Sequence, residues 1–351
     1  MKLLQVLYPG LGGTSTVALS IVNDLEKNAR SEVKNYFIFH GVEKLTKNNR
    51  QICRKKNINF SFFLKTSQIF DTLKVYSKIK SINPDYILSH SNSFFALLLI
   101  KIFTKKKFYC VDHTPDEVRS FKEWINLFLF ALFSNGIVFV SERDKDSKIF
   151  LIIKLISKKI KIIKNGVNTR KFKRKKNILK SKKIKIGMAA RFVNEKKQLL
   201  IIDTFIKNKI FFCDKNIQIS FAGSGILLNQ LKKKVKENNL TRNIKFEGNL
   251  TENKLINWFN KIDVYFHLSD AETTSTAILQ ALSNSLPVFA SKVQGNIQVS
   301  KYIGKKYIKL IKNDEKSVKN AILHIINNRT EFNNISKLIK KNVISKIDLN
   351  N

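Results

Sequence analysis

The sequence predicts an α/β protein with two doubly wound domains, each built on a parallel sheet that helices cover on both faces. Short apolar runs of strand length alternate with longer segments whose apolar residues recur at helical spacing. Glycine-rich turns come directly after several of these runs. A chain of 351 residues is also long enough to bury two hydrophobic cores. Alternation of this kind is typical of parallel sheets.

Strand and helix patterns alternate through the first half of the chain. The apolar run LLQVLY (3–8) predicts a strand, and TSTVALSIVNDLEK (14–27) predicts the helix after it. The other elements expected in this half are strands at 35–39, 85–90, 107–112 and 136–140 and helices at 68–81 and 94–103. KIKIIKNGVN (159–168) adds a last strand and a tight turn. The lysine-rich stretch that follows is the expected linker, so the first domain should span residues 1–172.

A second series of strands and helices starts after this linker. Its expected strands are 183–191, 217–223, 244–248, 263–269 and 286–291, with helices between them. We expect a second domain over residues 173–328 and a helical tail over residues 329–351 that packs back on the first domain. Ligands of doubly wound sheets bind at the carboxyl ends of the strands, so the loops after the strands should carry the site.

One apolar segment has to be distinguished from a membrane span. WINLFLFALFSNGIVFVS (124–141) is interrupted near its middle by Ser134, Asn135 and Gly136, and neither half approaches the ~20 apolar residues that a span needs. LLQVLY is too short for a signal peptide. The cysteines, Cys53, Cys110 and Cys213, show no spacing that indicates a disulfide or a metal site, which favours reduced thiols. We therefore expect a cytoplasmic protein.

The formal charge of +39 has two interpretations that stay open at this stage. Lysine is spread along the chain and is densest over residues 157–187, which suits a solvated, compositionally biased surface. It also suits attraction to an anionic membrane, with the protein peripheral on its inner face. Nucleic acid is the weaker hypothesis, because nucleic-acid readers usually concentrate arginine, whose planar fork pairs with bases and phosphates.

Two glycine-rich turns have the chemistry of phosphate-binding loops. YPGLGGTSTV (8–17) places Gly12 and Gly13 between a strand and a helix, and FAGSG (221–225) places Gly223 and Gly225 in the same way. Glycine allows close backbone approach, and a helix N-terminus offers free N–H groups to a phosphate. The first turn does not have the GxGxxG spacing, so a plain tight turn is an equal alternative there.

Charged side chains follow two strands of the second domain. Arg191 and Lys196 lie in AARFVNEKKQ (189–198), where two cations can reach one diphosphate. Glu272 follows the strand at 263–269 and precedes Thr273, Thr274 and Ser275 at a helix start. A capping role alone would explain such residues. Gln280 lies two turns further along that helix, ~12 Å along the axis.

In their order and spacing, these segments resemble the GT4-like retaining glycosyltransferases of the GT-B fold, also called glycosyl transferases group 1. The resemblance covers nearly the whole chain and also includes NGVNTRKF (165–172), INPDYILSHS (82–91) and AETTSTAILQALSNSLPVFAS (271–291). It implies two Rossmann-like domains across a cleft and transfer of a hexosyl group from a UDP- or GDP-sugar to a glycan or lipid-linked acceptor. The implied setting is bacterial surface polysaccharide biosynthesis: lipopolysaccharide, capsule or exopolysaccharide.

The resemblance also implies residue roles. Arg191 and Lys196 would hold the donor diphosphate, Glu272 would bind the hydroxyls of the transferred sugar, and His113 would contact that sugar near the bond that breaks. Gln280 stands where the family has a second acid that binds the ribose. The other donor-binding groups would be the backbone at Gly12, Gly13, Gly223, Gly225, Thr273, Thr274 and Ser275. The resemblance implies no metal, no other cofactor and no protein nucleophile.

Three alternatives accompany this interpretation. A sugar-nucleotide epimerase on the same fold would need several acid/base groups, and His113 and Glu272 are few candidates for them. A non-catalytic nucleotide-sugar-binding protein is suggested by the amide at Gln280, since the charge-assisted bond of an acid is lost there. A nucleic-acid binder is suggested by charge alone.

Overall fold

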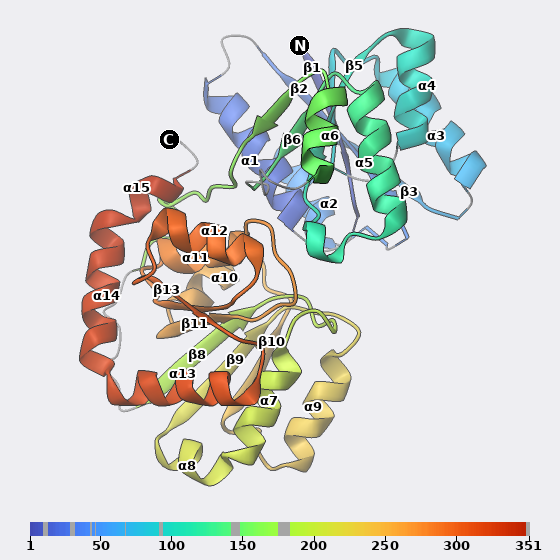
Figure 1. Ribbon diagram of the computed structural model, residues 1–351. Helices are drawn as coiled ribbons and strands as arrows, with labels where there is room; N and C mark the ends of the chain where they lie inside the picture. The colour runs from blue at the N-terminus through green and yellow to red at the C-terminus, as the bar shows by residue number, and fades with distance from the viewer. Residues whose placement is uncertain are drawn as a thin grey trace. The chain divides into compact units, whose positions relative to one another are not determined.

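The computed structural model contains two compact units, Met1–Asn165 and Gly166–Asn351 (Figure 1). It describes residues 1–9, 13–28, 32–42, 44–45, 47–66, 68–90, 94–141, 148–174 and 183–348. The division falls before residue 172, where the sequence placed the domain boundary. Val167 and Phe172 are the reason, because both are buried in a core of the second unit.

The N-terminal unit contains a seven-stranded parallel sheet with the order β3-β2-β1-β4-β5-β6-β7. Because the chain returns to the centre of the sheet before it builds the other half, the order reverses between β1 and β4, which is the switch point of a doubly wound fold. The strands are β1 (Lys2–Leu7), β2 (Lys34–Gly41), β3 (Asn59–Leu64), β4 (Tyr86–Ser89), β5 (Lys107–Asp112), β6 (Ile137–Phe139) and β7 (Ile160–Ile162).

Helices cover both faces of this sheet (Figure 1). One core is shared with α3, α4, α5 and α6, and the other with α1 and α2. The helices are α1 (Gly13–Asn28), α2 (Lys47–Lys55), α3 (Gln68–Ile82), α4 (Phe94–Thr104), α5 (Phe121–Phe133) and α6 (Lys148–Ile156), with a 3-10 turn at Asp116–Val118. α5 has a full capping box between Ser120 and Glu123, which fixes its start.

The C-terminal unit repeats the design with a six-stranded parallel sheet, ordered β10-β9-β8-β11-β12-β13. Its switch point lies between β8 and β11. The strands are β8 (Ile184–Ala189), β9 (Ile217–Ala222), β10 (Ile244–Gly248), β11 (Val264–His267), β12 (Val288–Ser291) and β13 (Ile308–Ile311). Two doubly wound sheets confirm the predicted fold class.

The helices of this unit also form two layers. One core is shared with α7 (Gln198–Lys207), α8 (Lys209–Asp214), α9 (Leu228–Glu237) and α13 (Glu315–Asn327). The opposite core is shared with α10 (Glu252–Phe259), α11 (Thr276–Ser283), α12 (Gln294–Ile303), α14 (Arg329–Asn342) and α15 (Ile344–Ile347). The helices of the C-terminal tail, α14 and α15, therefore pack within this unit, where both contact α11.

No helix among the described residues is long and apolar enough to cross a membrane. The segment that needed this test, residues 124–141, forms the greater part of α5 and then β6. Ser134 caps the end of α5, and its buried hydroxyl accepts a hydrogen bond from the Gly136 N–H at 3.2 Å. The predicted interruption and the strand after it are confirmed there.

Candidate functional site

Glu272 and Lys196 form a half-buried ion pair in the C-terminal unit, and their side chains are 13% and 16% exposed. The same carboxylate oxygen, Oε1, accepts a hydrogen bond from His267 Nε2 at 2.7 Å. Lys196 Nζ also donates to Ser269 Oγ at 3.0 Å. The structure therefore brings together two of the predicted catalytic residues at the carboxyl edge of the sheet, beside its switch point.

Backbone contacts explain why two residues so far apart in sequence meet. Lys196 lies in the loop after β8 and Glu272 in the loop after β11, and these strands pair in the sheet. The two loops continue this pairing, because Lys196 and Ser269 form an antiparallel bridge. The Asp270 N–H donates to the Glu195 carbonyl at 2.9 Å. The ion pair is therefore positioned by the main chain before any ligand arrives.

The charge state of Glu272 follows from its neighbours. Burial alone would raise the pKa of Glu272, but the Lys196 charge and the contacts from His267 and Lys196 lower this pKa to about 2. At neutral pH the carboxylate is therefore ionised, so it can only accept hydrogen bonds. Sugar hydroxyls, which donate, fit such a group.

His267 is a site residue that sequence reasoning missed, because a lone histidine in an apolar strand is usually structural. It is 3% exposed, and its ring stacks on Tyr265 at 23° between planes. The Tyr265 hydroxyl donates to the Ala189 carbonyl at 3.1 Å, and burial raises the pKa of Tyr265. The signal in the sequence was the alternation Tyr265, His267, Ser269, which places all three on one side of the strand.

Two glycines allow the loops of this site to pack closely against each other. A Cβ atom on Gly223, which has a φ of +135°, would lie 2.1 Å from the Ala190 carbonyl oxygen. A Cβ atom on Gly225 would lie 2.4 Å from the carbonyl oxygen of Phe192. These two predicted donor-binding glycines thus let the turn after β9 pack against the loop of Arg191.

Gly295, in the first turn of α12, allows a similar close approach on the other side. Its Cβ would meet the Thr273 carbonyl oxygen at 1.9 Å and that of Glu272 at 2.0 Å. Gly295 is a second site residue that sequence reasoning missed. Its importance comes from a tertiary contact that no local pattern reveals.

The remaining predicted residues of this unit differ in exposure. Ser275 is the N-cap of α11, and its hydroxyl accepts from the Ile278 N–H at 3.4 Å. Thr273 and Thr274, in the loop before it, are half-buried, as is Gln280 within the helix. Arg191 is exposed, and its carbonyl accepts from the side chain of Gln198 at 2.9 Å.

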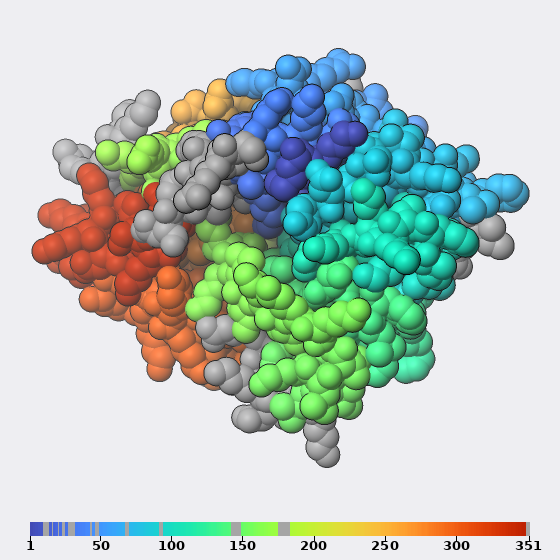
Figure 2. All heavy atoms as spheres, turned by 90° about the horizontal axis from the view of Figure 1, so that it is seen from above, coloured from blue at the N-terminus to red at the C-terminus, as the bar shows by residue number. Residues whose placement is uncertain are grey.

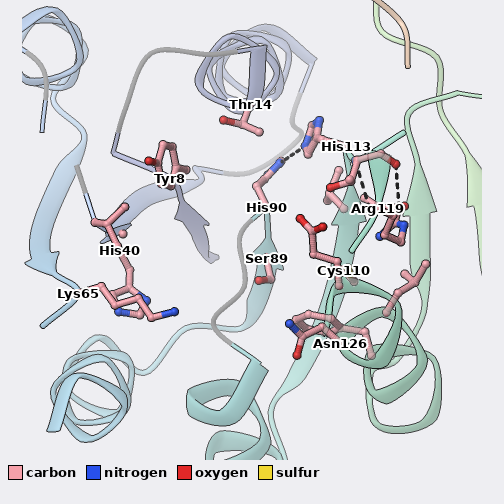
Figure 3. Close-up of a pocket in the computed structure, with 18 residues that line it drawn as sticks. Tyr8, Thr14, His40, Lys65, Ser89, His90, Cys110, His113, Arg119 and Asn126 are labelled. Carbon is pink, nitrogen blue, oxygen red and sulfur yellow. Dashed lines mark hydrogen bonds and ion pairs between the residues drawn. The ribbon is translucent and has the colours of Figure 1, made fainter. Parts of the chain in front are cut away.

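A cavity of about 350 Å³ lies in the N-terminal unit, at the carboxyl ends of its strands (Figure 3). His113, the fourth predicted catalytic residue, follows β5 and lines this cavity. Its Nε2 lies 2.9 Å from Nδ1 of His90, which follows β4. Burial lowers the pKa of His113 to about 4 and the pKa of His90 well below its usual value. Both rings are therefore neutral at pH 7.

Asp112 and Arg119 hold the chain around His113. Their side chains pair at 2.8 Å and are 7% and 3% exposed. Arg119 also donates to the Thr114 carbonyl at 2.7 Å and stacks over the Trp124 ring at 4.9 Å. Of the predicted glycines here, Gly12 lies outside the described residues, and Gly13 begins α1.

Among the residues that the structure describes, no group of histidine, cysteine, aspartate and glutamate side chains could hold a metal ion. The cysteines Cys53, Cys110 and Cys213 form no disulfide. Independence of metal therefore stays a prediction.

Comparison with known proteins identifies a family for one segment of the chain. Residues 169–342 match the family model described as glycosyl transferases group 1. These residues belong to that family. They contain Arg191, Lys196, Glu272 and the loops around them, so the ion-pair site lies wholly within the family segment.

Similar proteins match the chain over different lengths. Protein CapJ of Staphylococcus aureus is 30% identical over 153 residues, which are 43% of this chain and 37% of CapJ. The matched segment thus spans less than half of that relative. The structure of Anabaena HepE in complex with UDP and glucose is similar over 99% of this chain and 96% of the HepE chain. The TM-score is 0.78 and the sequence identity is 15%.

A glycosyltransferase from Rickettsia africae is similar over 99% of this chain and 94% of its own, with a TM-score of 0.73 and 20% identity. At these identities the structural likeness concerns the fold, and the fold is GT-B.

Proposed function

We propose that the protein is a retaining, GT4-like glycosyltransferase that moves a hexosyl group from a UDP- or GDP-sugar to a glycan or lipid-linked acceptor. The observation that carries the proposal is the ionised Glu272 beside Lys196, at the carboxyl edge of a doubly wound sheet and within the family segment. A carboxylate for sugar hydroxyls and a cation for phosphate are the two groups that a nucleotide-sugar donor requires. The UDP and glucose bound by Anabaena HepE support this donor class.

Lys196 has donor capacity beyond its contacts in the structure. An ammonium group has three N–H donors, and Glu272 and Ser269 account for two of them. We assign the third to the donor diphosphate, together with the exposed Arg191. Their positive charges would offset the charge that develops on the departing nucleotide.

The other donor contacts are assigned to the backbone around the ion pair. N–H groups near Thr274 and Ser275 at the start of α11 would assist the phosphates, and the turn of Gly223 and Gly225 would lie along the nucleotide. Gln280 would accept from the ribose through its amide oxygen. Gln280→Glu should restore a charge-assisted bond and raise donor affinity about tenfold. Unchanged affinity would place Gln280 outside the site.

Retention needs no protein nucleophile in this proposal. The donor phosphate would take the acceptor's proton on the face from which the nucleotide leaves, and His113 would contact a hydroxyl of the sugar. Arg191 and Lys196 would supply the positive charge that other enzymes obtain from a metal ion. Transfer should therefore survive chelation by EDTA, and a loss that Mg²⁺ restores would contradict this part.

The test of the function is a panel of nucleotide sugars. A donor at many times its Kd should raise the Tm, and the same donor should support transfer of labelled sugar to a glycan or lipid-linked acceptor. Glu272→Ala and Arg191→Ala should abolish or strongly reduce transfer. If both variants transfer sugar as fast as the parent protein, the assignment is wrong.

Two other outcomes of this experiment correspond to the alternatives. A sugar-nucleotide epimerase would convert the nucleotide sugar without any acceptor, which product analysis detects. A non-catalytic binder would give the Tm shift with no product. The segment's membership of a glycosyltransferase family favours transfer over both.

We also propose that the protein acts in the cytoplasm, at the inner membrane face, on acceptors for bacterial surface polysaccharide, with no nucleic-acid partner. Large apolar side chains are exposed on neighbouring helices of the N-terminal unit, which Figure 2 shows in teal to green: Phe95, Ile102 and Phe103 of α4, Phe121, Ile125, Phe128, Leu132 and Phe133 of α5, and Ile149, Leu151, Ile152 and Leu155 of α6. Lys122 and Lys154 are exposed on the same helices. Apolar side chains flanked by lysine suit an anionic bilayer.

Vesicles test this surface. Binding should be stronger to vesicles with anionic lipid than to neutral ones, and Phe121→Ser with Leu155→Ser should weaken it. Phe121 and Leu155 are 81% and 85% exposed, so these changes should leave stability intact. Ile210→Ser is the matched control, since Ile210 is 89% exposed in the other unit. Equal binding to both vesicle types would contradict the proposal.

A further inference from the structure

A buried glutamine begins a chain of hydrogen bonds that ends at His113. Gln5 lies in the middle of β1 and is 0% exposed. Its Nε2 donates to the Ala18 carbonyl of α1 at 3.2 Å, and its Oε1 lies 2.9 Å from His90 Nε2. A backbone carbonyl can only accept, so the amide has to turn its NH₂ group towards Ala18. Its oxygen therefore faces His90.

This orientation fixes the proton on His90. The oxygen of Gln5 can only accept, so His90 Nε2 has to carry a hydrogen. In a neutral imidazole the other nitrogen is then an acceptor, and here it is Nδ1. His90 is 6% exposed, and burial keeps it neutral by lowering its pKa.

His90 in turn determines which ring nitrogen of His113 carries a hydrogen. Its Nε2 lies 2.9 Å from His90 Nδ1, and the two rings lie nearly parallel, at 28° between planes (Figure 3). Since His90 Nδ1 accepts, His113 Nε2 has to donate. His113 is neutral at pH 7 because burial lowers its pKa to about 4. Its Nδ1 is therefore the acceptor atom of the ring.

We propose that Gln5 and His90 are positioning residues that hold His113 as its Nε2–H tautomer, so that His113 Nδ1 can accept a hydrogen bond but cannot donate one. For a sugar substrate, which rests on the proposed function, His113 then engages a hydroxyl as acceptor and does not protonate a leaving group. The role fits a transferase whose leaving group is a nucleotide held by cations. It does not fit an epimerase that uses His113 as an acid.

The tautomer can be measured without any substrate. In the full-length protein with ¹⁵N-labelled histidine, two-bond ¹H–¹⁵N spectra at pH 7 distinguish protonated from unprotonated ring nitrogens, and His90→Gln and His113→Gln assign the signals. We expect both rings to carry hydrogen on Nε2. A hydrogen on Nδ1 of His113 would overturn the proposal, whether or not the protein transfers sugar.

Gln5→Met tests the role of the glutamine. It keeps the length of the side chain and removes the acceptor for His90, so both rings should show mixed tautomers. Gln198→Met is the matched control: Gln198 is 1% exposed and also donates to a backbone carbonyl, but in the other unit. That variant should leave the His113 signals unchanged. Unchanged signals in Gln5→Met would remove Gln5 from the positioning role.

The rate adds a separate readout. Gln5→Met should lower kcat by up to about tenfold, the value of one hydrogen bond, with the donor KM little changed. If the parent protein has no transferase activity but has the expected tautomer, the proposed function fails and the tautomer assignment stands. If Gln5→Met does not fold, the spectrum of the parent protein still decides the tautomer.

Discussion

Replacing Gly295 with alanine should displace the loop that carries Glu272. The new Cβ would lie 1.9 Å from the Thr273 carbonyl oxygen, whereas ordinary contact begins at 3.4 Å. The loop or the start of α12 would have to retreat by about 1.5 Å, which is 3.4 minus 1.9. The atoms in the way belong to the backbone, so no side-chain rotation relieves the contact.

The expected loss of rate follows from this displacement of the loop. A misplacement of ~1 Å in a reacting group costs about 100-fold in rate, so kcat for sugar transfer should fall by at least roughly that factor. The overpacking should also lower the free energy of unfolding by about 1–3 kcal/mol. For a unit of this size the Tm should fall by roughly 2–12 °C. The assays are transfer of labelled sugar well below the Tm and a thermal melt.

Gly304→Ala separates the loss of activity from the loss of stability. Gly304 ends the same helix, where its φ is +126° and a Cβ would meet the side chain of Tyr307 at 3.2 Å. Alanine there is strained and should lower the Tm, yet it lies at the end of α12 away from the Glu272 loop. If Gly295→Ala keeps full activity, or loses no more than Gly304→Ala does, the close approach at Gly295 does not position Glu272.

The other predictions concern charge. Lys196→Gln should lower the free energy of unfolding in urea by on the order of 3 kcal/mol, because it removes a partner of the half-buried Glu272. An unchanged urea midpoint would contradict this. The pKa of Glu272 is lowered from 4.5 to about 2, so its stabilising contribution should be complete above pH ~4.5 and lost as the pH falls towards 2; the stability difference between the parent protein and Glu272→Gln should shrink over that range. Asp112→Asn should lower the free energy of unfolding by about 3–5 kcal/mol, because it leaves Arg119 buried without its closest carboxylate. Asp214→Asn, at an ion pair that is mostly exposed, should change this free energy by less than about 1 kcal/mol.

The sequence was sufficient for the fold class because the elements that define it have clear periods. In the second unit, for example, Ile217–Ala222 is a short apolar run that ends in a glycine turn. The sequence interpretation missed β3, whose side chains are mostly half-exposed at the edge of the sheet. It also missed α6, whose apolar residues lie on all sides and give no clear face.

The site was predictable where residue chemistry follows a strand. Lys196 and Glu272 were found in this way, and the sheet brings them into contact. Gln5, His90 and His267 were not recognised, because a polar side chain inside an apolar run gives no sign of its partner. Those partners lie on other elements, so only the folded structure reveals them.

The burial of the histidines affects how the protein responds to acid. Burial lowers the pKa of four of the five histidines, which are His40, His90, His113 and His324. Burial therefore makes these rings harder to protonate than an exposed histidine. A moderate fall in pH would thus change the net charge of the protein less than the same number of exposed histidines would.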